Sequence, residues 1–295
     1  MSAAAAVFAG GPWAQAWRRL RASPQAWLGA LLLAAIAAAC ALLPALLGLD
    51  PVATDLAARH LPPGSAHPFG TDALGRDLLA RVLVGGRTSL AIGLAATASS
   101  VLIGVLVGAL AGLHGGRVDE LLMRLVDFLY GVPYRFLVIL VMLLFSETAR
   151  GEAVPVFLAL GLVQWLTLAR IVRGQVLSLR GQDYVLAARA LGASDTTVLL
   201  RHLLPNTLGP IVVYATLTVP AVIILESFLS FLGLGVALSW GQLVAEGVAV
   251  VNPLRSYWWL LAWPGAFLAA TLMALNFLGD GLRDALDPRS RTRLP

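Results

Sequence analysis

SLAIGLAATASSVLIGVLVGALAGL, residues 89–113, is the apolar stretch that decides the fold of this chain. It contains no charged residue, and as an α-helix it is long enough to cross a hydrocarbon core about 30 Å thick. The whole chain of 295 residues is 59% hydrophobic and only 13% charged, which is too apolar for an ordinary soluble domain. We therefore expect an all-α membrane protein.

Five further apolar runs complete a set of six expected transmembrane helices. The six are residues 27–49, 89–113, 128–145, 154–168, 208–232 and 257–278. The fourth run is short, and we expect it to extend around Arg170, whose stem can reach the interface. Twelve arginines lie on the side of the N-terminus and six on the other side. The positive-inside rule then predicts that both termini are cytoplasmic.

This topology divides the chain into five parts. They are a cytoplasmic N-terminal tail (1–26), the first transmembrane helix (27–49), a periplasmic segment (50–88), a five-helix core (89–279) with a cytoplasmic loop (173–207), and a cytoplasmic C-terminal tail (280–295). The first span could instead be a signal peptide, because arginines precede it and Cys40 follows three alanines. The apolar run continues past Cys40, so a membrane anchor fits better.

The composition excludes several kinds of chemistry. All 21 basic residues are arginine, which removes the lysine of a P-loop ATPase and the lysine of a Schiff base. A single cysteine, Cys40, and four scattered histidines give no disulfide and no zinc-like spacing, so we expect no metal site. An intramembrane enzyme would need an aspartate pair, a HExxH helix or a serine–histidine set, and the expected spans contain none of these.

The strongest functional signal is the polar loop GQDYVLAARALGASDTTVLLRHLLPNTLGPIVV, residues 181–213. Its first part is rich in alanine and leucine and predicts a helix. Gly192 stands where a chain reversal requires positive φ, and Ser194 or Asp195 can cap a second helix, which we expect Pro205 to end. The small residues would let another backbone approach closely, so the loop has the form of a docking element.

This loop resembles the conserved cytoplasmic loop of the permease subunits of binding-protein-dependent ABC importers. Ala187, Ala188, Gly192 and the run LLPN at 203–206 match the usual pattern, whereas Leu186 occupies the position where that family usually has glutamate. In the family the loop forms coupling helices that sit in a groove of the ATPase subunit. The resemblance assigns the docking contact to Tyr184, Ala187, Ala188, Arg189, Gly192, Ala193, Asp195, Arg201, Pro205 and Asn206.

Further matches narrow the resemblance to the C-type permeases of dipeptide, oligopeptide and nickel importers. They are HPFGTDALGRDLLARVLVGGRTSL (67–90), ESFLSFLGLG (226–235) with the following Ser-Trp-Gly, and LGDGLRDALDPR (278–289). The resemblance implies one subunit of a multi-pass transporter of the bacterial inner membrane, itself without cofactor or catalytic residues. Its implied partners are a second permease in a heterodimer, two ATPase subunits that bind ATP and magnesium, and an external solute-binding protein.

The substrates implied are di- or oligopeptides, with nickel complexes or glutathione as alternatives inside the same subfamily. In that subfamily specificity lies mainly in the separate binding protein, so this chain does not encode it. A secondary transporter driven by an ion gradient is the alternative of another class. It would predict inverted repeats and broken helices with acidic residues near the midplane, and the sequence shows no convincing repeat.

Four residues in or beside the expected spans are candidates for the translocation path or its gate: Asp127, Pro133, Arg135 and Glu226. An ionisable group in hydrocarbon needs a partner or an aqueous cavity. Glu226 could hydrogen-bond a neighbouring helix or line the path. Arg124 and Asp127 are spaced to form an ion pair on one helix face. Arg135 could reach the cytoplasmic headgroups, helped by a kink at Pro133, or meet a substrate carboxylate.

The periplasmic segment is rich in charge and we expect it to form a solvated cap that touches an external partner. Asp72 and Asp77 are spaced about one helical turn from Arg76 and Arg81, which predicts local ion pairs. His60, His67 and Asp72 do not have the spacing of a known metal site.

Overall fold

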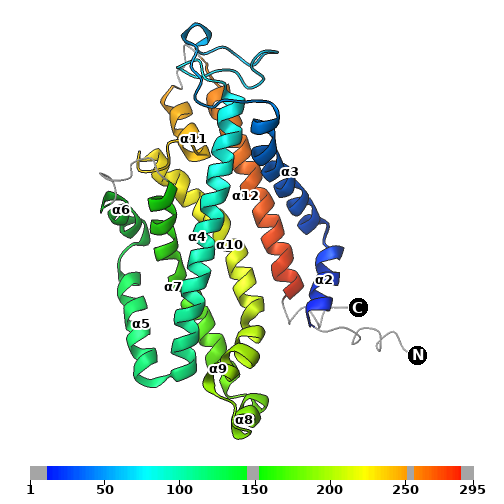
Figure 1. Cartoon of the computed structure of the whole chain (residues 1–295), viewed down its shortest axis with the longest axis vertical. Helices are drawn as coiled ribbons and strands as arrows, with labels where there is room; N and C mark the ends of the chain where they lie inside the picture. Colours follow the sequence, from blue (N-terminus) through cyan, green and yellow to red (C-terminus); the bar gives the residue numbers. More distant parts are fainter. Residues whose placement is uncertain (1–11, 145–152, 251–255, 287–295) are drawn as a thin grey trace, which may run out of the picture.

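The computed structural model describes residues 12–144, 153–250 and 256–286, and these residues form helices joined by loops. In chain order the elements are α2 (Pro12–Ala22), α3 (Pro24–Leu46), the 3-10 turn η1 (Leu56–Ala58), α4 (Leu78–His114), α5 (Gly116–Gly131), α6 (Tyr134–Leu144), α7 (Ala153–Arg180), α8 (Asp183–Ala190), α9 (Asp195–Val198), the π-helical turn η2 (Leu199–Leu203), α10 (Leu204–Phe231), α11 (Trp240–Ala249) and α12 (Trp259–Leu286). Figure 1 shows the long helices running side by side, with α8 and α9 projecting from one end.

Within the described ranges, five helices are long and apolar enough to span a membrane, and the pair α5–α6 makes up to six if it counts as one broken span. This agrees with the expected all-α architecture of six spans. The third span was predicted incorrectly as one helix over 128–145. It begins at Gly116 and bends by 89° between α5 and α6. Pro133 lies at the bend, where it has no N–H to continue a helical ladder.

Other helices extend beyond the expected spans. α4 begins at Leu78, so the end of the expected periplasmic segment is helical, and α7 runs to Arg180, so the expected loop at 173 begins inside a helix. Part of the expected N-terminal tail forms α2, which packs against α12. Residues 1–11 of that tail, the expected external link at 146–152 and the end of the C-terminal tail lie outside the described residues.

α4 packs closely against α7 because glycines recur every four residues along α4. A Cβ at Gly104 would lie 2.9 Å from the Cβ of Leu168, and one at Gly112 would lie 2.8 Å from the Cβ of Val176. A Cβ at Gly108, between them, would collide with the carbonyl oxygen of Ala169. Small residues at this spacing let two membrane helices approach closely, since van der Waals packing drives their association.

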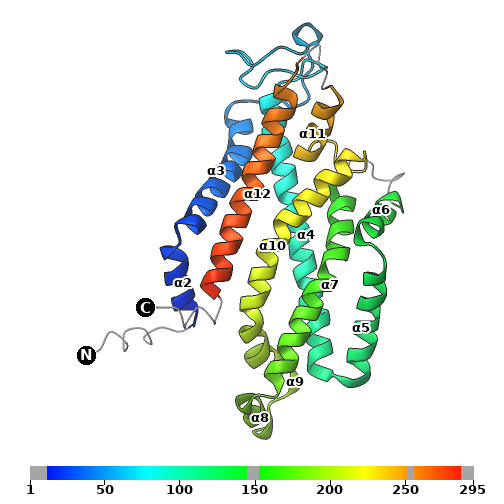
Figure 2. The same cartoon turned by 180° about the vertical axis from the view of Figure 1, so that it is seen from behind.

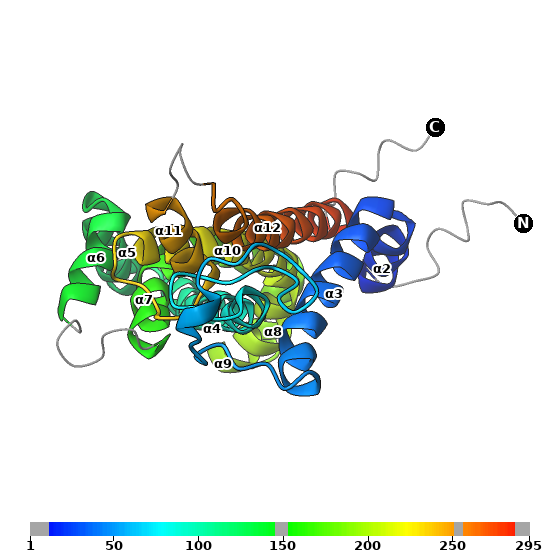
Figure 3. The same ribbon diagram turned by 90° about the horizontal axis from the view of Figure 1, so that it is seen from above.

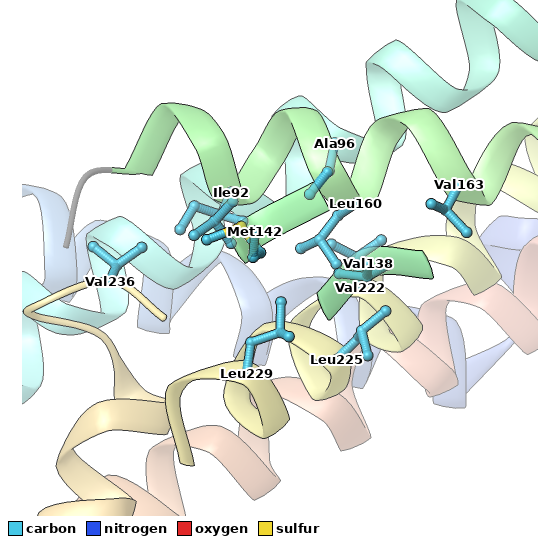
Figure 4. Close-up of a cluster of buried hydrophobic side chains, with 12 residues drawn as sticks. Ile92, Ala96, Val138, Met142, Leu160, Val163, Val222, Leu225, Leu229 and Val236 are labelled. Atoms are coloured by element: carbon cyan, nitrogen blue, oxygen red, sulfur yellow. The ribbon is translucent and has the colours of Figure 1, made fainter. Parts of the chain in front are cut away.

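The short helix α6 lies across the bundle and closes a buried apolar cluster. Figure 4 shows Val138 and Met142 of α6 among side chains of α4, α7 and α10. This cluster joins the four helices at the end of the bundle away from α8. Figure 3 places α5 and α6 on one side of the molecule and α2 and α3 on the other, with α4 and α10 between them.

Residues 55–77, called the cap segment here, cover the same end of the bundle. Phe69 stacks on Trp263 with ring centroids 4.0 Å apart, and His60 stacks on Tyr257 at 4.1 Å. The indole N–H of Trp259 donates to the carbonyl of Thr71 at 3.2 Å. These contacts fix the cap segment on the first turns of α12 and the residues before it.

Candidate docking loop and membrane-level polar groups

The loop expected to dock a partner is a short helix held to the bundle by one buried side chain. Val185 of α8 is fully buried and joins an apolar cluster with Val176 of α7 and with Val198 and Leu203 that follow the turn. The other side of α8 faces outward. Figure 2 shows α8 beyond the ends of α7 and α10, so the helix is attached to both of them and open on its far side.

The turn after α8 has the geometry that the sequence predicted. Gly192 has φ +87°, and the Ser194 hydroxyl accepts a hydrogen bond from the Thr197 N–H as the cap of α9. Arg189 and Asp195 form an ion pair of 3.0 Å across the turn. Most of the predicted docking residues are exposed, and Ala188 and Ala193 are half-buried. They share one end of the bundle, although the contact with a partner stays a prediction.

Sequence reasoning missed Leu191, which is 90% exposed at the tip of this turn. Leu186, which stands in place of the usual glutamate, is 52% exposed. With Tyr184, which is 43% exposed, these leucines are three exposed apolar side chains on a polar loop. The signal was present in the sequence as an apolar residue directly before the reversal at Gly192.

Pro205 does not end the second helix, contrary to the prediction. The chain runs from α9 through η2 into α10 without a break, and Pro205, which has no N–H to donate, directly follows the π-helical turn. The Leu204 N–H reaches back to the carbonyl of Leu199, which is the spacing of a π-helix. The Asn206 side chain donates to the carbonyl of His202 at 2.6 Å. The second helix of the loop and the fifth span therefore form one continuous helix, which begins at Asp195.

Glu226 lies fully buried in α10 among serine hydroxyls from three elements. It accepts hydrogen bonds from Ser230, one turn further along α10, at 2.8 Å and from Ser89 of α4 at 3.4 Å. Ser89 also accepts from the N–H of Trp240, and Ser239 caps α11 and lies 3.2 Å from the Ser230 hydroxyl. These contacts correspond to the expected hydrogen-bonding role. A role as a gate stays a prediction.

The expected ion pair between Arg124 and Asp127 is wrong. Arg124 instead pairs with Glu120 one turn earlier, at 2.5 Å. Asp127 pairs with Arg170 of α7 at 2.6 Å, and the Arg170 guanidinium lies 4.0 Å from the ring centroid of Tyr130. Helical spacing allowed both partners for Arg124, whereas the α5–α7 contact that selects Arg170 depends on tertiary packing.

Arg135 lies at the start of α6, next to the bend at Pro133. Its Nε donates to the Tyr134 hydroxyl at 3.3 Å, and its guanidinium carbon is 5.6 Å from the ring centroid of Phe228. The whole of α5 separates it from the α4–α5 turn. α5 thus places Arg135 toward the end of the bundle opposite α8, and its reach to the cytoplasmic headgroups stays a prediction.

A buried ion-pair network connects the cap segment to α11. Asp72 pairs with Arg76 and Arg81 at 2.7 Å each, and Arg81 also pairs with Glu246 of α11 at 2.7 Å. Burial alone would raise the pKa of Asp72, but hydrogen bonds from Arg76 and Leu74 and the charge of Arg81 hold this pKa below its usual value. All four charged side chains line a cavity of about 280 Å³.

The network confirms the Asp72–Arg76 pair and corrects the expected partner of Asp77. Asp77 caps α4 through the Ala80 N–H and contacts His67 at 2.8 Å. Glu246 was missed because it is distant in sequence, and only the fold brings it to Arg81. Among the described residues no group of three or more histidine, cysteine, aspartate or glutamate residues is arranged to hold a metal ion.

Two family models match the chain. The model described as "binding-protein-dependent transport system inner membrane component" matches residues 104–292, which include the docking loop and Glu226. The model described as "N-terminal TM domain of oligopeptide transport permease C" matches residues 11–63.

Several whole proteins and one solved structure are also similar to this chain. The dipeptide transport system permease protein DppC of Bacillus subtilis is 43% identical over 279 residues, covering 94% of this chain and 85% of that protein. The oligopeptide transport system permease protein OppC of Escherichia coli K12 is 46% identical over 230 residues, covering 77% of this chain and 74% of that protein. A chain of the MetNI methionine ABC transporter in an inward-facing conformation matches with a TM-score of 0.57 at 19% identity, covering 70% of this chain and 96% of that one.

Proposed function

This chain belongs to the family of binding-protein-dependent transport system inner membrane components, and we propose that it forms half of a translocation path for di- or oligopeptides. It is the multi-pass inner-membrane permease subunit of an ABC importer, and ATP hydrolysis takes place on separate subunits. It works with other permease, ATPase and binding-protein subunits. The family assignment sets aside the alternative of a transporter driven by an ion gradient.

The observation that supports peptides as substrates is the identity of 43% to a dipeptide transport permease across nearly the whole chain. We propose a heterodimer with a second permease, two ATPase subunits that bind ATP and magnesium, and an external solute-binding protein in a bacterial plasma membrane. No cofactor is assigned to this chain. Nickel complexes and glutathione are alternatives with no supporting observation of their own.

The geometry of α8 supports its role as the ATPase contact. Tyr184 and Leu186 of α8 and Leu191 of the following turn are exposed apolar side chains, while Val185 fixes the helix to α7 and to the helix that continues into α10. A partner that moves α8 therefore pulls on two spans together. On this proposal, closure of the ATPase subunits displaces the loop as a unit, and the spans alternate between inward and outward openings.

Copurification from detergent of this chain with the ATPase subunits encoded beside it tests the docking contact. We expect Leu191→Asp to abolish capture of the ATPase, because a carboxylate would have to be buried in the contact without a partner. Leu56→Asp is the matched control, since Leu56 is 65% exposed at the opposite end of the bundle. Equal capture by both variants would contradict the docking assignment.

Uptake by the reconstituted complex tests the transport function. Vesicles that contain the complex and receive the loaded binding protein should accumulate peptide only with ATP, in the absence of any ion gradient. The Leu191→Asp variant should not accumulate it. Accumulation without ATP, or of nickel complexes but not peptides, would overturn this proposal.

A further inference from the structure

The helix α2, which leads into the first span, is amphipathic and basic. Its 11 residues include three arginines and no acidic residue. The helix packs against α12 and its Ala16 is buried, whereas Arg18 and Arg21 are exposed. Figure 1 shows α2 beyond the end of α3, on the side of the bundle that carries α8. A basic amphipathic helix next to a membrane span is typical of an element that lies along the membrane surface.

An apolar groove of about 230 Å³ lies where α2, α3 and α12 meet. Its lining includes Trp17 and Arg21 of α2, Ala26, Trp27 and Ala30 of α3, and Leu278 of α12. The short side chains of the two alanines leave this space open, and a larger residue at Ala30 would fill part of it. Trp17 and Trp27 remain 50% and 53% exposed. The groove is therefore an apolar recess with two indoles and one guanidinium beside it.

The length of α3 sets the depth of this groove. α3 has 23 residues, a rise of about 34 Å, which is little more than the hydrocarbon core of about 30 Å that it has to cross. Its first turn, which contains Ala26 and Trp27, therefore lies where acyl chains meet headgroups. Arg18 and Arg21 lie beyond the end of α3, at the level of the headgroups. Exposed tryptophans are enriched at this boundary in membrane proteins.

Neither Arg18 nor Arg21 forms an ion pair with an acidic side chain among the described residues. They are three positions apart on α2 and so are neighbours on its surface. The guanidinium carbon of Arg21 lies 4.9 Å from the ring centroid of Trp17, so an aromatic ring holds this cation beside the groove. Two exposed acids of α12, Asp280 and Asp284, lie toward this end of the bundle without pairing to either arginine. The two cations are left available to an external anion.

We propose that this groove binds an anionic phospholipid, with the phosphate on Arg18 and Arg21 and part of an acyl chain beside Trp17 and Trp27. A guanidinium suits a phosphate because its planar fork presents parallel N–H donors. Basic pockets between membrane helices are a setting in which lipid headgroups bind. A phospholipid of this leaflet carries its phosphate and its chain in the same order along the membrane normal as the arginines and the groove. A free phosphate would leave the groove empty, and a protein partner would need a matching acid above an apolar side chain.

The test places the purified complex in phosphatidylcholine vesicles with a small fraction of a photoreactive lipid. One probe is phosphatidylglycerol, and the other is phosphatidylcholine with the same reactive chain. After illumination the chain is digested, and mass spectrometry measures the label on residues 12–30. At a low probe fraction, labelling is proportional to affinity. Plain phosphatidylglycerol and soluble glycerol phosphate serve as competitors, because only the first has acyl chains.

We expect the phosphatidylglycerol probe to label this segment more strongly than the phosphatidylcholine probe, and plain phosphatidylglycerol to suppress the label. Arg18→Gln and Arg21→Gln should each reduce labelling by phosphatidylglycerol about fivefold, or ~1 kcal/mol. Arg117→Gln is the matched control for charge, because Arg117 is exposed at the start of α5 on the opposite side of the bundle (Figure 3). It should change labelling less than about twofold.

A second pair of variants tests the groove itself. Ala30→Leu should reduce labelling by both probes, because its side chain takes the place of the acyl chain. Ala14→Leu is the matched control for size, since Ala14 is exposed on α2 outside the groove lining. It should leave labelling unchanged.

Three results would overturn the lipid assignment. Equal labelling by the two probes, unchanged in the arginine variants, would show that the arginines select no anionic headgroup. Suppression by glycerol phosphate together with normal labelling of Ala30→Leu would show a site for free phosphate instead. A wild-type segment that takes no label would show that another subunit or another part of this chain covers the groove. The measurement requires no transport, so its outcome is independent of the proposed substrate.

Discussion

Replacement of Glu226 is the sharpest test of how the end of the bundle opposite α8 is held together. Glu226→Ala removes the acceptor of the Ser89 and Ser230 hydroxyls and leaves a cavity in a site that is 0% exposed. Side-chain hydrogen bonds between membrane helices average ~0.6 kcal/mol each, and the cavity adds about 1–2 kcal/mol. We therefore expect a loss of about 2–3 kcal/mol.

Glu226→Gln provides the matched control because it keeps the size of the side chain and an acceptor oxygen. It should cost less than about 1 kcal/mol if the role of Glu226 is to accept hydrogen bonds. Thermal unfolding of the detergent-purified complex, at a fixed scan rate, measures the loss of stability in each of the two variants. At about 2–4 °C per kcal/mol, Glu226→Ala should lower the apparent Tm by about 4–12 °C and Glu226→Gln by about 4 °C or less.

Two results would refute this reasoning about Glu226. Equal Tm values for Ala and Gln would show that the carboxyl oxygens contribute nothing beyond their charge. A wild-type Tm for Glu226→Ala would show that the Ser89 and Ser230 contacts do not support the fold. ATP-driven uptake by Glu226→Gln adds an independent readout, since a stable variant that cannot transport would favour the gate role instead.

Three further predictions concern the cap segment and the α4–α7 contact. Arg81→Met should lower stability by about 3 kcal/mol, because it leaves buried Asp72 without its Arg81 partner, and the apparent Tm of the complex measures this loss. Because folding lowers the pKa of Asp72, its contribution to stability is present above the unfolded value of about 3.9 and is lost as pH falls toward the folded value. Asp72→Asn should therefore make the apparent Tm fall less steeply as the pH is lowered. If the Tm of this variant depends on acidic pH as the wild type does, the Asp72 network does not contribute to stability. Gly108→Ala should reduce the yield of folded protein, whereas Gly131→Ala, where a Cβ meets nothing within 4 Å, should not, as size-exclusion chromatography would show.

The sequence predicted those features that local chemistry determines. Apolar length located the spans other than the third, and the turn at Gly192 followed from the need for positive φ. The cap at Ser194 followed from the preference of helix N-termini for serine. Each of these depends on a few neighbouring residues, so no knowledge of packing was required.

The features that the sequence could not predict depend on contacts between distant segments. Arg124 and Asp127 are correctly spaced for each other, but α7 brings Arg170 to Asp127. Glu246 reaches Arg81 only because α11 folds back over the start of α4. The break at Pro133 was foreseen only as a kink, because the 89° bend is stabilised by the packing of α6 against α7 and α10.

The misjudged role of Pro205 has the largest consequence for the mechanism. A helix that ended there would leave the docking loop flexibly attached, and movement of α8 would be absorbed in a hinge. Instead the segment from Asp195 to Phe231 is continuous, so the second helix of the loop and the level of Glu226 lie on one helix. Pro210 and Pro220 interrupt its hydrogen-bond ladder, and Figure 2 shows α10 bent along its length. If the proposed docking role is right, a displacement of α8 would reach the first half of α10 through the turn at Gly192 and would be redirected at these two prolines.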